Sequence, residues 1–294
     1  MKIDSHTSLY CILGNPVHHS LSPCIHNAGF QKLKINAVYV AFETENIENA
    51  IRGIRALGIK GCSVTIPFKT EVIKYLDEIL EIGRLIGAVN TIINKGGRLI
   101  GTNTDAFGFY KALSYKTEIT DKTIAIFGSG GAARAGIFSL FYYDKPSKVI
   151  IVARNREKRE EIKAEIFNSF KKIGREISDD CLTTRDLSEW KNFMNEVDII
   201  INTTPVGMTP EISNSILETD EIPEEKIVMD IVYNPFETKF LKLAKSKKCK
   251  VIPGIDMLLL QGIKQFELWT EVSPPVNTMR KALKKAISKK VAKR

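Results

Sequence analysis

Apolar residues in the first third of the chain fall into short continuous runs separated by segments with helical spacing. The runs at 7–13, 37–43 and 61–66 predict strands, and the segments at 24–33 and 46–57 predict helices. An order of strand, helix, strand, helix, strand is typical of a parallel sheet. Ligands bind at the edge where the carboxyl ends of such strands meet, so residues that follow these runs are candidates for a binding site.

The pattern changes after the third strand. A helical pattern covers 70–85 and is broken at 87–91. Two short apolar runs at 91–94 and 98–101 then predict a hairpin across Lys95-Gly96-Gly97. A helix at 106–113 is expected to lead into the second half of the chain.

The second half alternates apolar runs with helical segments. Strands are expected at 124–127, 148–153, 197–202, 227–232 and 250–252. Helices are expected at 132–141, 157–170, 238–247 and, strongly apolar, 254–269. Two stretches lack a clear period: 171–190 is expected to be irregular and 211–225 to be a surface loop. This alternation predicts a second α/β domain.

Length and charge refine this picture. A chain of 294 residues is long for one core and suits two domains. The net charge of +9 arises almost wholly from an acid-free C-terminal stretch containing Arg280, Lys281, Lys284, Lys285, Lys289, Lys290, Lys293 and Arg294. A solvated helix end explains this stretch simply, and a tail that binds anions or RNA is the alternative.

The five cysteines form neither a CxxC pair nor a Cys/His cluster. We therefore expect reduced thiols, with no disulfide framework and no structural metal. No apolar run approaches the roughly 20 residues of a membrane span. The N-terminal residues lack the apolar segment of a signal peptide, so a cytoplasmic protein is expected.

The sequence Gly128-Ser129-Gly130-Gly131-Ala132-Ala133 follows an apolar strand directly and opens a helix. It fits the pattern G-x-G-x-x-G/A, in which the first glycine permits a tight turn and the second lets the backbone approach a pyrophosphate. The first N–H groups of the helix and its dipole favour the negative charge. Glycines alone usually mark only a turn, but the order of strand, turn and helix predicts a dinucleotide site.

The residues after the next strand bear on the choice of cofactor. An NAD site usually has an acidic residue there to bind the ribose 2′-hydroxyl. This chain has Ala153-Arg154-Asn155-Arg156 instead. Because a guanidinium pairs with a 2′-phosphate and an acid would repel it, the sequence predicts NADP. Two solvated arginines before a charged helix are the simpler alternative, and they account for Arg156 more easily than for Arg154.

Polar residues with complementary chemistry follow the strands of the first half. Ser20 and Ser22 lie at a helix start and could bind a carboxylate, although Ser22 could also serve only as a helix cap. Thr65 and Lys69 end the third strand. We expect Lys69 to be the proton donor in the reduction of a ketone and Asp105 to orient its ammonium group. A solvated lysine and a helix cap are the simpler alternatives.

Two further features belong to the second half. The loop Thr203-Thr204-Pro205-Val206-Gly207-Met208 follows a strand and could cover the middle of a bound dinucleotide. Gln261 is an amide within a strongly apolar helix and needs a polar partner. That partner could be a structural hydrogen bond or a substrate.

Seven motifs in order give the chain a family resemblance. They are GNPVHHSLSPCIHN at 14–27, SVTIPFK at 63–69, GAVNT at 87–91, GTNTDAFG at 101–108, GSGGAAR at 128–134, NTTPVGM at 202–208 and GIDMLLLQG at 254–262. Together they resemble the shikimate dehydrogenases, which use NADP to interconvert 3-dehydroshikimate and shikimate in aromatic amino-acid biosynthesis. The resemblance runs from about residue 13 to residue 269.

The resemblance implies roles for individual residues. Ser20 and Ser22 would hold the substrate carboxylate with Tyr233 nearby, and Lys69 and Asp105 would be the catalytic pair. The ring hydroxyls would be bound by Thr65, Asn90, Asp105 and Gln261. Many family members have Asn where this chain has Ser63, so a substrate contact from Ser63 would be shorter or mediated by water.

The resemblance also implies a cofactor site and a domain plan. NADP would contact Gly128, Ser129, Gly130, Gly131, Ala132, Ala153, Arg154, Asn155, Lys158, Thr203, Thr204, Val232, Gly254 and Met257. The usual Asn-Arg-Thr adenosine loop is here Ala153-Arg154-Asn155, which keeps the arginine. A substrate domain with a mostly parallel sheet (1–107) would be completed by C-terminal helices (255–294), and a Rossmann-type NADP domain (108–254) would be inserted between them.

Three other functions are consistent with parts of the sequence. A quinate/shikimate dehydrogenase of the same superfamily would have a broader choice of substrate and cofactor. A regulatory protein that senses NADP would not need Lys69 and Asp105, and both are present. A nucleic-acid-binding protein would depend on the basic C-terminal stretch. We expect a small-molecule substrate, no metal, no membrane or nucleic-acid partner, and a monomer or homodimer.

Overall fold

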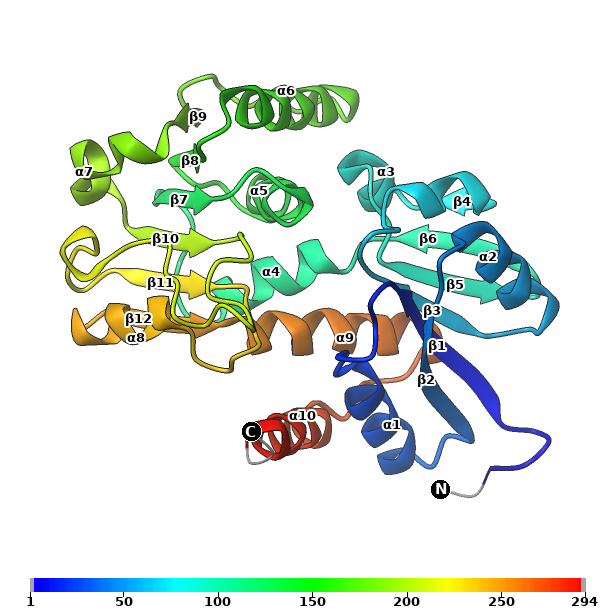
Figure 1. Cartoon of the computed structure of the whole chain (residues 1–294). Coiled ribbons are helices and arrows are strands. Elements are labelled where there is room, and N and C mark those ends of the chain that lie inside the picture. The colour runs from blue at the N-terminus through cyan, green and yellow to red at the C-terminus, as the bar shows by residue number, and fades with distance from the viewer. Residues whose placement is uncertain (1–2, 292–294) are drawn as a thin grey trace. The chain divides into compact units, whose positions relative to one another are not determined.

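The computed structural model describes residues 3–291, with the side chains of 3–288. It divides into two compact units: the described residues up to Thr104 together with those from Gln261 onward, and Asp105–Leu260 (Figure 1). The sequence placed these borders at 107/108 and 254/255. At the first border the difference arises because helix α4 (Asp105–Ser114) lies against α5 (Gly131–Tyr143), which places residues 105–107 in the second unit.

The first unit contains a six-stranded sheet in the order β2-β1-β3-β5-β6-β4. Its strands are β1 (Ser8–Gly14), β2 (Ala37–Glu43), β3 (Gly61–Val64), β4 (Glu78–Ile79), β5 (Thr91–Lys95) and β6 (Arg98–Thr102). Strand β1 is parallel to β2 and β3, and β5 is antiparallel to β3 and β6. The expected hairpin is thereby confirmed. The carboxyl ends of β1 and β3 meet at one edge of the sheet.

The helix expected at 70–85 is wrong. The chain instead forms a 3₁₀ helix (Glu71–Tyr75), the short strand β4 and helix α3 (Glu81–Ile86). Asp77 causes the interruption: its N–H donates to Leu99 O at 3.0 Å, and its carboxylate accepts from Leu99 N at 2.6 Å. These bonds hold the segment beside β6, so tertiary pairing overrides the local helical pattern.

Helices from both ends of the chain cover the first sheet. They are α1 (Ser22–Lys32), α2 (Ile47–Ala56) and the C-terminal half of α9 (Gly254–Thr270), while α10 (Val276–Val291) lies against α1 (Figure 1). Asn46 caps α2 by accepting a hydrogen bond from Asn49 N at 2.9 Å. The predicted return of the C-terminal helices to the N-terminal domain is therefore confirmed.

Two glycines make room for the aromatic side chains of α9. A Cβ at Gly29 would lie 2.6 Å from the ring of Phe266, and a Cβ at Gly61 would lie 2.5 Å from the indole of Trp269. The indole N–H of Trp269 donates to Ile92 O at 2.9 Å. Because real Cβ contacts are longer than these, the fit between α9 and the N-terminal segments requires glycine at both positions.

The second unit contains six parallel strands in the order β12-β11-β10-β7-β8-β9. They are β7 (Thr123–Phe127), β8 (Lys148–Val152), β9 (Leu182–Arg185), β10 (Ile199–Asn202), β11 (Ile227–Asp230) and β12 (Lys250–Pro253). This is the strand order of a dinucleotide-binding domain, and it confirms the Rossmann-type fold. The sequence missed β9 in the stretch expected to be irregular, since only Leu182 of its four residues is buried.

The helices of the second unit are α5, α6 (Arg156–Lys172), α7 (Trp190–Phe193) and α8 (Lys239–Ser246), together with α4.

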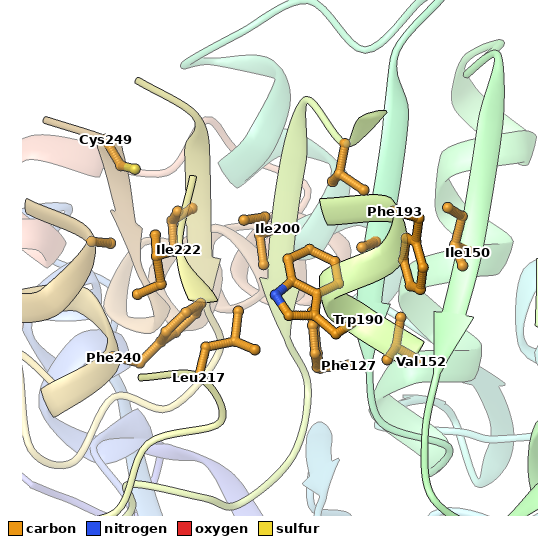
Figure 2. Packing of buried hydrophobic residues seen from close by; sticks show 14 of the residues in the cluster. Phe127, Ile150, Val152, Trp190, Phe193, Ile200, Leu217, Ile222, Phe240 and Cys249 are labelled. Atoms are coloured by element: carbon orange, nitrogen blue, oxygen red, sulfur yellow. The ribbon is translucent and has the colours of Figure 1, made fainter. Parts of the chain in front are cut away.

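The packing in the core of the second unit explains why its strands are apolar. Figure 2 shows Trp190 between Phe127 and Phe193, with Ile200 and Val152 nearby. The ring of Trp190 meets that of Phe127 edge-on at 5.0 Å, and its N–H donates to Glu221 O at 2.7 Å. Strands buried on both faces appear in the sequence as continuous apolar runs.

Replacing Gly29 by alanine should destabilise the protein, because the new Cβ overlaps Phe266. We expect the free energy of unfolding to fall by about 1–3 kcal/mol. Gly53 is the matched control, since it also lies within a helix and a Cβ there has no neighbour within 4 Å. Gly53→Ala should raise the free energy of unfolding by about 0.5–1 kcal/mol. Denaturant titration measures both, and equal effects would contradict the proposed fit.

Candidate active site

The glycine-rich turn joins β7 to α5 and leaves open space where its second and third glycines lie. Gly128 has a φ of 125°, and a Cβ there would lie 2.5 Å from Thr203 Oγ1. At Gly130 and Gly131 a Cβ would meet nothing within 4 Å. Gly130 precedes the first residue of α5 and makes no side-chain cap. This turn can therefore receive a phosphate group at a helix N-terminus.

The segment after β8 is cationic and exposed. Arg154, Arg156 and Lys158 are exposed, and Asn155 caps α6 by accepting from Lys158 N at 2.9 Å. Arg159 is buried beneath them, where it donates to Ala153 O and pairs with Asp186 at 2.9 Å. The loop is thus anchored from below while its cations face solvent. This donor set fits the 2′-phosphate of NADP.

The loop after β10 is held by a buried carboxylate that the sequence analysis missed. Asp230, at the end of β11, accepts hydrogen bonds from Asn202 Nδ2 (3.0 Å), Val232 N (3.0 Å) and Thr238 Oγ1 (2.6 Å). Asn202 Oδ1 in turn accepts from Thr204 N and Oγ1 at 2.9 and 2.7 Å. Burial raises the pKa of Asp230 to about 6. The sequence did contain a signal for this carboxylate, because two apolar strands each end in a polar residue, Asn202 and Asp230.

The other predicted cofactor residues lie in the same unit. Thr203 is buried, and its hydroxyl donates to Phe127 O at 2.7 Å, next to the glycine turn. Gly254 begins α9 so close to the end of β11 that a Cβ would lie 2.3 Å from Ile231 O. The structure therefore brings the glycine turn and the β10 loop together. The remaining residues are placed as follows: Ser129 and Ala132 in the turn and the start of α5, Val232 after β11, and Met257 in α9.

In the first unit, Ser20 and Ser22 lie at the start of α1. Leu21 is the N-cap residue and Ser22 is the first residue of the helix, so Ser22 is not the cap. Its N–H donates to Ser20 Oγ at 3.3 Å, and its side chain is only 4% exposed. The Ser20 hydroxyl thus lies next to the first backbone N–H of α1.

Thr65 and Lys69 follow β3, and both are half-buried. Thr65 N donates to Leu13 O at 2.9 Å, which joins it to the end of β1. Lys69 O accepts from Val89 N at 2.7 Å, which places the backbone of Lys69 next to the segment that carries Asn90. Backbone hydrogen bonds thus join Thr65 to the end of β1, and Lys69 to the segment that carries Asn90, within the first unit.

Asn90 and Gln261 lie in a buried polar network. Asn90 Nδ2 donates to Thr104 Oγ1 at 3.1 Å, and Thr104 Oγ1 lies 3.5 Å from Gln261 Oε1. Ser63 is also buried, between Tyr39 OH at 2.6 Å and Gln265 Oε1 at 3.0 Å. The sequence did not predict a role for Gln265. Its only indication was that Gln265 is a second amide one helical turn after Gln261.

Asp105 and Tyr233 belong to the second unit. Asp105 is the first residue of α4, and Tyr233 follows β11; both are half-buried. Their predicted roles beside Lys69 and the substrate carboxylate remain predictions.

His26 is a core residue rather than a site residue. Its ring is fully buried and stacks on Tyr39 with centroids 4.5 Å apart. Burial lowers the pKa of His26 to about 3. The ring is therefore neutral at ordinary pH and supplies no charge to the site.

Other expectations concern metals, thiols and membranes. Within residues 3–291, no group of three or more His, Cys, Asp or Glu side chains could hold a metal ion. The five cysteines are free thiols. Among the described helices, none has both the length and the apolar character to cross a membrane.

Comparison with known proteins gives matches along nearly the whole chain. Residues 12–92 match a family model described as the shikimate dehydrogenase substrate binding domain, and residues 254–284 match the shikimate 5′-dehydrogenase C-terminal domain. A shikimate dehydrogenase (NADP(+)) of Methanocaldococcus jannaschii is 43% identical over 98% of this chain and 100% of its own length.

Two solved structures extend this comparison. A crystal structure of a shikimate dehydrogenase in complex with NADP+ is 42% identical, covers 97% of this chain and 98% of its own, and superimposes with a TM-score of 0.90. A Listeria monocytogenes shikimate 5-dehydrogenase in complex with shikimate and NAD is 33% identical and has a TM-score of 0.84. The match covers 96% of this chain and 98% of the Listeria chain.

The buried neutral ring of His26 should make folding sensitive to acid. In the unfolded chain the imidazole gains a proton below its usual pKa near 6.5, whereas in the folded chain it does so only near 3. Stability is therefore lost as the pH falls between these values, by about 3 kcal/mol between about pH 7 and pH 4. His26→Phe should remove this contribution from the pH dependence of unfolding. His6→Phe, at an exposed position, should leave it unchanged; a slope equal to wild type in both variants would contradict the assignment.

Proposed function

The chain belongs to the shikimate dehydrogenase family, and from this premise we propose that it interconverts 3-dehydroshikimate and shikimate with NADP. The observation that carries the proposal is the match to an NADP-dependent relative at 43% identity over 98% of the chain, which spans both units. The protein is thus an oxidoreductase that acts on a secondary alcohol. Its substrate is a small ring carboxylate with several hydroxyls.

We assign the substrate chiefly to the first unit. Ser20 and Ser22 bind the carboxylate through their hydroxyls at the start of α1. The ring hydroxyls are assigned to Thr65, Asn90, Asp105 and Gln261. The family resemblance places Tyr233 near the carboxylate and gives Ser63 a substrate contact that is shorter or mediated by water. The support is chemical, because half-buried and buried hydroxyls and amides select a polyhydroxylated ring through directed hydrogen bonds.

We assign the cofactor to the second unit. The diphosphate binds at the open turn of Ser129, Gly130 and Gly131, and Arg154 and Lys158 bind the 2′-phosphate. The other assigned contacts are Gly128, Ala132, Ala153, Asn155, Thr203, Thr204, Val232, Gly254 and Met257. When bound, NADPH supplies the hydride that reduces the ketone carbon.

The protein's part in the chemistry is to bind, orient and move one proton. Lys69 donates a proton to the oxygen of the reduced carbonyl, and in the reverse direction it accepts that proton from the hydroxyl. We assign to Asp105 the orientation of the Lys69 ammonium group. A neighbouring carboxylate favours the charged form of a lysine.

Cellular location and assembly complete the proposal. Free thiols at all five cysteines are typical of a reducing compartment, which favours the cytoplasm. We propose that the chain acts as a monomer or homodimer.

The function is tested by offering the purified protein shikimate or quinate, each with NADP or NAD. Formation of reduced nicotinamide, followed by its absorbance, should be fastest with shikimate and NADP, because the segment after β8 is cationic and lacks the acid that favours NAD. Comparable rates with quinate or NAD would instead indicate a broader quinate/shikimate dehydrogenase. No reaction in any combination would contradict enzymatic function and favour a sensor of NADP.

Replacing Lys69 by alanine should lower kcat by about 10²–10⁴-fold with a much smaller rise in KM for shikimate. The reason is that the proton is needed mainly in the transition state. Lys74→Ala is the control, since Lys74 is exposed in the 3₁₀ helix that follows. Steady-state kinetics in both directions measure the effect. A raised KM with unchanged kcat would make Lys69 a binding residue only.

A further inference from the structure

We infer that Gln265 is a positioning residue for substrate recognition. Its buried amide joins the three segments that carry Thr65, Asn90 and Gln261: the end of β3, the start of β5 and helix α9. The inference rests on the proposed function, because these three residues are assigned there to the ring hydroxyls. Gln265 itself acts through its neighbours.

The amide of Gln265 is fully engaged. The residue is 1% exposed. Its Oε1 accepts from Ser63 Oγ at 3.0 Å, and its Nε2 donates to Asn90 O at 3.2 Å and to Thr91 Oγ1 at 2.9 Å. Both N–H groups and the carbonyl thus have partners, and these partners come from two strand ends of the first sheet.

The direction of these hydrogen bonds follows from the backbone. The carbonyl oxygen of Asn90 can only accept, so it must face the N–H side of the Gln265 amide. Oε1 of Gln265 then faces Ser63, and the Ser63 hydroxyl donates its proton to it. Tyr39 OH in turn donates to Ser63 Oγ at 2.6 Å. The proton of Ser63 is therefore directed to Gln265, and Ser63 supports the site through that amide.

The second branch sets the amide of Asn90. Thr91 Oγ1 accepts from Gln265 and donates to Asn90 Oδ1 at 2.7 Å. Thr104 N also donates to Asn90 Oδ1, at 2.7 Å. Because a backbone N–H can only donate, the Oδ1 side of Asn90 must point inward, and these two short bonds occupy it.

The consequence is that Asn90 presents a donor to the substrate. One N–H of its Nδ2 donates to Thr104 Oγ1 at 3.1 Å. The other N–H has no acceptor among residues 3–288. A substrate hydroxyl that faces Asn90 must therefore accept a hydrogen bond there. Gln265 enforces this polarity by fixing the Thr91 hydroxyl, and it also holds the Asn90 backbone directly.

Three substitutions test the role. Gln265→Met keeps the length of the side chain but removes the amide, and Thr91→Val removes the hydroxyl that links Gln265 to Asn90. Each should raise KM for shikimate about tenfold, as loss of one ordered buried hydrogen bond predicts, with kcat altered less than about threefold. Thr91→Ser retains the hydroxyl and should restore most of the wild-type KM. KM for NADP should not change, since the assigned cofactor residues lie in the other unit.

Trp269→Phe is the control for a purely structural effect. Trp269 lies one turn after Gln265 and also bonds to β5, through Ile92 O, but it is outside the amide chain. Trp269→Phe should lower the midpoint of thermal unfolding and leave KM for shikimate near that of wild type. A double-mutant cycle adds a second readout: the effect of Gln265→Met on KM should shrink in an Asn90→Ala background.

The outcomes separate the two levels of the proposal. A wild-type chain without shikimate-dependent activity would overturn the proposed function, and the inference with it. If the wild-type chain is active and Gln265→Met leaves KM for shikimate unchanged, the inference alone is overturned. If Gln265→Met does not fold, an unchanged KM in Thr91→Val has the same consequence. The inference would also be overturned if Trp269→Phe raised KM for shikimate as much as Gln265→Met does. The same holds if the effects of Gln265→Met and Asn90→Ala on KM were fully additive, because Gln265 would then be a structural residue only.

Discussion

The packing of α9 against the first sheet is the contact on which the substrate-binding unit depends. Phe266 and Trp269 fill spaces that Gly29 and Gly61 leave open, and the Trp269 indole bonds to the backbone of β5. Gln265 and Gln261, on the same helix, are buried beside this contact. Gln265 and Gln261 can therefore form directed hydrogen bonds with partners from the N-terminal segments. A buried amide tolerates few alternative arrangements, since an unpaired polar group in the interior is costly.

The two units place their polar residues in the same way. In each, apolar strands are buried and the residues just beyond their carboxyl ends are polar: Thr65 and Lys69 after β3, and Thr203 and Thr204 after β10. The loops are held from beneath rather than by contacts at the surface. In the first unit Gln265 holds the start of β5 through Asn90 O and Thr91 Oγ1, and in the second unit the Asp230 carboxylate holds the loop after β10 through Asn202. Such support fixes the direction of each side chain before a ligand arrives, which lowers the ordering cost of binding.

Part of the fold and of the site was predictable from the sequence because the signals are local. Apolar runs identified the strands, and the turn at Gly128 was found because a tight turn beside a strand demands glycine. Local signals failed where pairing was decided elsewhere in the chain. Asp77 bonds to β6 and interrupts the expected helix at 70–85, and β9 exists because it completes the edge of a sheet beside β8.

By itself, the sequence determined the class of the fold, the inserted dinucleotide domain and the residue types available for chemistry, because each follows from periodicity, turn chemistry or family motifs. Only the tertiary structure decided how those residues are oriented. Ser63 and Gln265 are separated by 202 positions, and their hydrogen bond exists because α9 returns to β3. The same packing made His26 a neutral core residue and turned Asn90 into a donor. Hydrogen-bond direction depends on all partners of a group at once, and those partners meet only in the folded chain.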